Sequence, residues 1–145
     1  MPVLEQVLEK YSKDVKLVFK NFPLRNHRYA RQAAIASLAA EEQGKFWEFH
    51  DLLFKDHKSL NNQKIREIAE KLGLDMEKFA RDARDAKVQT RITRDMSDAA
   101  KAGVRATPTI FINGRVLRGH SLKAFDAMID KELERISKRA GKPAS

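Results

Sequence analysis

The sequence contains no cysteine among its 145 residues. Disulfide exchange requires a thiolate, and no other side chain replaces it, so these residues cannot perform dithiol redox chemistry by themselves. No apolar run approaches the roughly 18 residues that a membrane-spanning helix needs. We therefore expect a soluble chain without a membrane partner, and cysteine usage indicates no particular redox compartment.

Acidic residues are missing from two long windows. No aspartate or glutamate lies between Asp14 and Glu41 or between Asp98 and Asp126, and each window holds five lysines or arginines. The formal net charge is +9, so the rest of the chain is close to neutral. Clustered cations favour polyanions, but no recognition motif or interleaved aromatic residues accompany them. We interpret the windows as basic faces open to an acidic partner, and we do not expect nucleic acid as the partner.

The residue types that carry metal-dependent or nucleophilic chemistry form no recognisable motif. None of the four histidines, His27, His50, His57 and His120, stands at metal-ligand spacing from another. No serine lies in a nucleophile elbow, and no glycine-rich loop has phosphate-binding spacing. We expect no metal, no cofactor and no hydrolase chemistry.

The most informative stretch runs from Gly103 to Gly119 and reads GVRATPTIFINGRVLRG. In its centre, Asn113-Gly114 separates the β-favouring run Ile110–Ile112 from the apolar pair Val116-Leu117. Both turn residues tolerate the positive φ of a type I′ turn, so this spacing predicts a β-hairpin.

A proline stands at the mouth of the predicted hairpin. Pro108 cannot donate a backbone hydrogen bond and pushes Thr107 out of the helical region, so the pair belongs before the first strand. The cis form of such a bond costs only about 0.5–1 kcal/mol. Composition alone favours trans but leaves both isomers open.

Apolar spacing predicts helices along most of the remaining chain. The β-branched run Val15–Phe19 is too short for a helix and predicts a strand. The closing residues Gly141–Ser145 have the composition of a frayed tail. The predicted helices cover Pro2–Lys13, Asn26–Gly44 with Asn26 as N-cap, Phe46–Phe54, Asn61 or Asn62 to Gly73, Asp75–Arg84, Val88–Gly103 and Ser121–Ile136.

Two phrases resemble the DsbA-like branch of the thioredoxin-fold oxidoreductases. Residues Thr107–Gly114 are similar to its Thr-Pro step followed by Thr-hydrophobic-Phe-hydrophobic-Asn-Gly, and Gln43–Asp51 resembles a phrase of its inserted helical domain. The resemblance implies an α/β, thioredoxin-like (DsbA-like) fold and one domain over residues 1–145. Its thioredoxin-core part would be 1–24 and 100–138, and its inserted helical part 25–99.

The resemblance also implies a site. In that family the proline corresponding to Pro108 is cis, and the backbone of its loop pairs with the substrate peptide. Ala106, Thr107, Pro108 and Thr109 are therefore the predicted peptide-binding residues, although Ala106 stands where the family commonly has glycine. No catalytic residue is predicted, because the family's Cys-x-x-Cys is absent.

The resemblance begins only after the family's first strands. The family places those strands and the Cys-x-x-Cys before the residues that match Pro2-Val3-Leu4, so an incomplete core sheet is implied. The absent strand would lie between the segments matching Val15–Phe19 and Thr109–Ile112. Direct pairing of these segments, exchange between two protomers or a strand added by a partner peptide would fill the gap. We expect self-association rather than a monomer.

Three functional hypotheses remain open. The first is a DsbA-like chain of the disulfide-forming family that is redox-inactive as written but retains a surface for an extended peptide or protein. The second is a self-associating interaction module without catalysis, and the third is a basic nucleic-acid-associated protein. No signal peptide is recognisable, which favours the cytoplasm; if the chain is a fragment of a longer family member, a periplasmic or exported location is expected.

Overall fold

The computed structural model describes residues 2–141. In this structure the chain forms two compact units. Residues 1–19 and 105–145 form one, called here the terminal unit, and residues 20–104 form the other, called the helical unit. From residue 142 onward, the predicted frayed tail lies outside the described residues.

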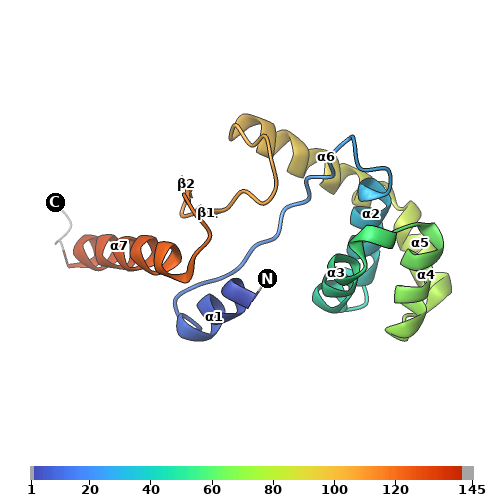
Figure 1. The fold of residues 1–145 in the computed structure, drawn as a ribbon, viewed down its shortest axis with the longest axis horizontal. Helices are drawn as coiled ribbons and strands as arrows, with labels where there is room; N and C mark the ends of the chain where they lie inside the picture. The colour runs from blue at the N-terminus through green and yellow to red at the C-terminus, as the bar shows by residue number, and fades with distance from the viewer. Residues whose placement is uncertain (1, 142–145) are drawn as a thin grey trace. The chain divides into compact units, whose positions relative to one another are not determined.

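Helices dominate both units (Figure 1). In chain order the elements are α1 (Pro2–Lys10), α2 (Ala30–Glu41), α3 (Phe46–Lys55), the 3₁₀ helix η1 (His57–Ser59), α4 (Asn62–Lys71), α5 (Met76–Arg84), α6 (Ala86–Lys101), β1 (Phe111–Ile112), β2 (Arg115–Val116) and α7 (Leu122–Ala140).

The helical unit is built around α2, which contacts α3, α4, α5 and α6 (Figure 1). Small side chains make this close packing possible: Ala39 and Ala40 are fully buried against neighbouring helices. The rings of Phe49 and Phe79 meet in the same core with their centroids 5.9 Å apart. A small-residue helix surrounded by larger apolar side chains thus forms the core of this unit.

Side-chain caps fix several predicted helix starts. The side chain of Asn61 accepts a hydrogen bond from the amide of Lys64 at 2.8 Å, and that of Asp75 accepts from Lys78 at 3.0 Å. The predicted cap at Asn26 was wrong, because α2 begins at Ala30 without any side-chain cap. Backbone bonds of the preceding turns, from His27 to Leu24 and from Ala30 to His27, occupy that stretch instead.

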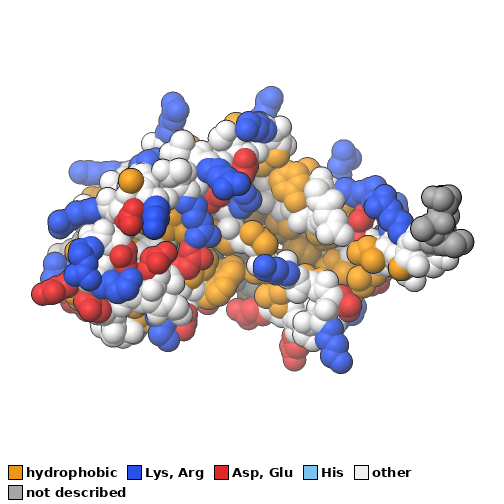
Figure 2. All heavy atoms as spheres, turned by 180° about the vertical axis from the view of Figure 1, so that it is seen from behind, with side chains coloured by type: hydrophobic (Ala, Val, Ile, Leu, Met, Phe, Trp, Pro, Cys, Tyr) orange, Lys and Arg blue, Asp and Glu red, His pale blue; other side chains and the backbone are white. Residues whose placement is uncertain are grey.

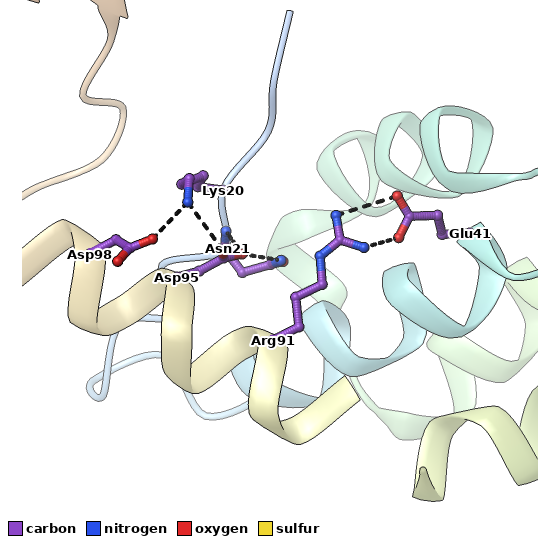
Figure 3. Close-up of polar contacts among 6 residues, drawn as sticks. All are labelled: Lys20, Asn21, Glu41, Arg91, Asp95 and Asp98. Carbon is purple, nitrogen blue, oxygen red and sulfur yellow. Dashed lines mark hydrogen bonds and ion pairs between the residues drawn. The ribbon is translucent and has the colours of Figure 1, made fainter. Parts of the chain in front are cut away.

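Helix α6 anchors the first residues of the helical unit (Figure 3). The buried carboxylate of Asp95 accepts hydrogen bonds from the backbone amide of Asn21 at 2.9 Å and from its side-chain amide at 3.0 Å. Lys20 donates to Asp98 at 2.8 Å, which lowers the pKa of Asp98 and raises that of Lys20. One turn earlier, Arg91 pairs with Glu41 of α2 (Figure 3).

The terminal unit packs α1, α7 and the hairpin around one apolar cluster, which includes Val7, Leu117, Phe125 and Ile129. Strands β1 and β2 are antiparallel, with Phe111 opposite Val116 and Ile112 opposite Arg115. The turn residues Asn113 and Gly114 have φ values of 47° and 78°, the left-handed values that a type I′ turn requires. The predicted hairpin is confirmed.

The predicted strand at Val15–Phe19 was wrong. Residues 15–24 adopt no regular secondary structure. A strand exists only where its backbone pairs with a neighbour, and within residues 2–141 the sheet consists of β1 and β2 alone. The result is a mostly helical α/β chain with an incomplete sheet, as the fold-class prediction states.

Candidate functional site

The four predicted site residues lie together in an exposed loop that leads into β1. Ala106, Thr107, Pro108 and Thr109 are all solvent-exposed. The Thr107–Pro108 peptide bond is cis. The hydroxyl of Thr109 donates a hydrogen bond to the carbonyl of Ala106 at 2.6 Å and closes the loop on itself.

One edge of β1 is open. The carbonyl of Ile110 accepts a hydrogen bond from the amide of Leu117 at 2.8 Å, so Ile110 faces β2. Backbone groups alternate in direction along an antiparallel strand, and those of Thr109 and Phe111 therefore point away from β2. No other strand in the described part of the chain lies along that side of β1. Thr107 to Phe111 thus form an edge whose backbone groups are available to a partner, here called the open edge.

The hairpin has one covered face and one bare face. Ile110, Ile112 and Leu117 belong to the apolar cluster with α1 and α7. Phe111 and Val116, which lie opposite each other across the strands, are 38% and 49% exposed. Phe111 borders the open edge, and Val116 lies beside it on β2, so a strand added at the open edge would find the Phe111 side chain to pack against.

A buried carboxylate attaches the hairpin to α7. The side chain of Glu132 is only 7% exposed and lies 3.3 Å from Nε of Arg115 on β2. Arg135, one turn further along α7, donates to both carboxylate oxygens at 3.1 and 3.3 Å. Asn113 of the turn donates at 3.4 Å. Glu132 therefore sets the position of the turn and, through it, of β1.

A second polar cluster joins α1 to α7. The hydroxyl of Tyr11 lies 3.0 Å from a carboxylate oxygen of Asp126 and 2.9 Å from one of Asp130. Burial, followed by these hydrogen bonds, raises the pKa of Tyr11 well above its usual range. Lys10 bonds to Asp126 at 3.0 Å and thereby lowers the pKa of that carboxyl. The cluster holds in place the two helices that support the hairpin.

Within residues 2–141, no three histidine, aspartate or glutamate side chains gather in a way that could hold a metal ion. The same residues include no helix whose length and apolar character would let it cross a lipid bilayer.

Comparison with known proteins identifies the family. The sequence profile of the family described as Thioredoxin matches residues 2–131. The chain belongs to the thioredoxin family. A solved structure of a thioredoxin-like oxidoreductase from Silicibacter pomeroyi superimposes with a TM-score of 0.76 at 26% sequence identity, covering 92% of this chain and 78% of that one. The predicted thioredoxin-like fold is thus confirmed.

Curated relatives of this thioredoxin-family chain are much longer proteins. The Na(+)/H(+) antiporter NhaA 3 of Salinispora tropica is 37% identical over 130 residues, which are 88% of this chain and 20% of the relative. The antiporter NhaA of Herminiimonas arsenicoxydans is 38% identical over 109 residues, 75% of this chain and 17% of the relative. The chain therefore spans about a fifth of the length of these relatives.

Sequence reasoning missed the polar contacts that support the site. The spacing of residues along the predicted helix indicates two of these contacts. Glu132 and Arg135 are three residues apart, and Asp126 and Asp130 are four residues apart, so each pair lies on one face of the helix. Their distant partners, Arg115 and Tyr11, leave no local signal, since only the folded chain brings them to α7.

Proposed function

We propose that this chain is a DsbA-like, non-catalytic member of the thioredoxin family that binds an extended peptide segment along its open edge, Thr107 to Phe111. The observation that carries the proposal is the outward direction of the Thr109 and Phe111 backbones, along a strand edge that has no neighbouring strand within residues 2–141. Strand addition of this kind uses main-chain hydrogen bonds for affinity and alternate side chains for specificity.

The expected affinity is modest. Each added backbone hydrogen bond contributes about 1 kcal/mol net. The open edge is short, so apolar packing on Phe111 must supply much of the rest. Ala106 to Thr109 would take the role that the family gives to its cis-proline loop, contact with the substrate backbone. The cysteine chemistry of oxidoreductase relatives has no counterpart, because no thiol is present in the sequence.

The same edge supports an alternative occupant, a second copy of this chain. A symmetric pair of β1 strands would extend the two-stranded sheets into one sheet across the interface. Light scattering over a concentration series separates the alternatives, because only self-association makes the average mass rise with concentration.

A second candidate function rests on the curated relatives. Since similar sequence occurs within longer proteins named Na(+)/H(+) antiporters, the chain would work as a module attached to, or associated with, such a transporter. Co-purification of the tagged chain with an antiporter from the same cells would support this function, and its consistent absence from the purified transporter would refute it.

The peptide-binding proposal is tested with a pair of synthetic probes. A short fluorescein-labelled peptide of alternating valine and glutamine is compared with a version N-methylated at every residue, which cannot donate a backbone hydrogen bond along either edge. Anisotropy should report binding of the first peptide and loss of binding for the methylated one. Equal binding of both would contradict strand addition, because side-chain contacts alone would then explain the affinity.

A further inference from the structure

A hollow beside the hairpin has room for a small molecule. It has a volume of about 450 Å³ and lies between residues 115–118 and α7. Binding sites for small ligands commonly have volumes of about 300–1,000 Å³. Its two walls are held together at two points, because Arg115 of β2 pairs with Glu132 of α7 and Leu117 packs with Phe125 in the apolar cluster. The hollow is therefore formed before any ligand arrives.

The walls of the hollow are mostly apolar. Val116, Leu117 and Met128 line it with larger side chains, and Val116 is 49% exposed. On α7, Ala124 and Ala127 contribute only methyl groups, so the space beside them stays open. A ligand with an apolar body would remove this surface from water, which stabilises the bound state in proportion to the area covered.

The charged side chains of the hollow are predominantly positive. Arg115, Arg118 and Lys131 line it, and its one acidic lining residue is Glu132. The carboxylate of Glu132 is 7% exposed and is already engaged by Arg115 and Arg135. Arg118 and Lys131 make no ion pair with any residue from 2 to 141. Figure 2 shows lysine and arginine side chains along α7 with apolar side chains between them. Two cations of the hollow thus remain available to an anion.

We propose that this hollow binds an aliphatic carboxylate, a small molecule that carries one carboxylate on a hydrocarbon chain. The two carboxylate oxygens would accept hydrogen bonds from Arg118 and Lys131, and the chain would cover Val116 and Met128. Inorganic phosphate would satisfy the cations but leave the apolar walls in water. An aliphatic alcohol would cover the walls but leave the cations without an anion.

This site is separate from the open edge. Strand β2 pairs with β1 on one side, and the hollow lies on its other side, toward α7. The inference therefore goes beyond the proposed peptide binding and does not depend on it. Nine residues line the hollow, whereas each side of a stable protein–protein interface has about 20–30 residues. A small molecule consequently fits the hollow better than a protein partner does.

A chemical-shift titration of the isotope-labelled chain at low salt tests the proposal. The probe is octanoate, kept below the concentration at which it forms micelles. We expect saturable shifts at the amides of Val116, Leu117, Ala127 and Met128, which line the hollow, and no shift at Thr109 on the open edge. The absence of saturable shifts, or shifts confined to residues away from the hollow, would refute the proposal.

Companion probes separate the contributions of chain and charge. Butanoate keeps the carboxylate but lacks four methylene groups, each worth up to about fourfold in affinity when fully buried, so it should bind at least about tenfold more weakly. Octanol lacks the charge and should bind about fivefold more weakly than octanoate, because exposed ion pairs are individually weak. Octylammonium should bind more weakly than octanol. If octylammonium or inorganic phosphate binds as tightly as octanoate, the proposed ligand class is wrong.

A charge variant locates the carboxylate. Arg118→Gln/Lys131→Gln should bring the affinity for octanoate down to that for octanol and leave octanol binding unchanged. The matched control is Lys13→Gln/Lys16→Gln, which removes the same net charge from exposed residues of the terminal unit that do not line the hollow. This control should bind octanoate as the unaltered chain does. Equal losses in both variants would refute a local anion site, because net charge alone would then explain the effect.

A variant that fills the hollow tests the apolar contacts. Ala127 is an exposed residue of α7 that lines the hollow, and Ala127→Leu keeps a good helix former at this position. The larger side chain should weaken the binding of both octanoate and octanol by about fivefold or more. Unchanged or tighter binding of both would refute the placement of the chain between β2 and α7. That result would leave the peptide-binding function standing, because the open edge is not part of this site.

Discussion

Replacement of Glu132 by glutamine tests how the hairpin is held in place. The substitution keeps the shape of the side chain but removes the charge that Arg115 and Arg135 meet at 3.1 to 3.3 Å. Breaking a buried ion pair costs about 3–5 kcal/mol when the remaining charge is trapped. Here the two arginine side chains are 51% and 36% exposed and can turn to water, so we expect about 2 kcal/mol.

A loss of about 2 kcal/mol corresponds to a fall in melting temperature of about 4–8 °C for a chain of this size. Circular dichroism measures the melting temperature, and hydrogen exchange at the amide of Leu117 reports on the hairpin itself. The matched control is Glu134→Gln on the same helix, whose side chain is 72% exposed and 4.0 Å from Lys138. If Glu132→Gln lowers stability no more than this control does, the carboxylate does not anchor the hairpin and the reasoning is refuted.

Three further predictions concern other parts of the chain. Asp95→Ala should lower the free energy of unfolding in urea by about 2–4 kcal/mol, because it leaves the buried side chain of Asn21 without its acceptor. The control Asp98→Ala removes only an exposed ion pair and should cost less than about 1 kcal/mol. Equal effects of the two substitutions would contradict the anchoring of Asn21 by Asp95. The pKa of Tyr11 is raised in the folded chain, so the contribution of the protonated hydroxyl to stability is intact below the ordinary phenol pKa of about 10 and is lost as the pH rises above that value. Tyr11→Phe should therefore reduce the loss of stability that thermal melts show at alkaline pH. An unchanged dependence of the melting temperature on alkaline pH would contradict this prediction. Gly114→Ala should lower the free energy of unfolding by about 1–2 kcal/mol, since φ at this position is +78°, and a neutral effect would argue against the type I′ turn.

Most of the secondary structure could be predicted from the sequence, because helix caps and tight turns depend on residues that are close together in the chain. The caps at Asn61 and Asp75 and the turn at Asn113-Gly114 each depend on residues within one turn of the chain. The strand predicted at Val15–Phe19 was wrong because a strand depends on a partner that can be distant in the sequence. Its composition suits a strand, but pairing requires a neighbour that the described residues do not provide.

For the candidate site, too, the sequence predicted the features that depend on neighbouring residues and missed those that depend on distant ones. Resemblance to a family directed attention to Ala106–Thr109, and the structure places these residues in one exposed loop. The direction of the open edge followed only from the bond between Leu117 and Ile110, which depends on the strand register. The contacts of Glu132 depend on how α7 packs against the hairpin, and no sequence period encodes that packing.

Amide hydrogen exchange along β1, read residue by residue by NMR, tests the central claim most directly. In the dilute free chain we predict fast exchange at Thr109 and Phe111 and slow exchange at Leu117, whose amide is bonded within the hairpin. A saturating extended peptide should slow exchange at Thr109 and Phe111 and leave Leu117 unchanged. Amides of Thr109 and Phe111 that are already protected in the dilute chain, or that stay unprotected with bound peptide, would contradict an open edge that accepts a strand.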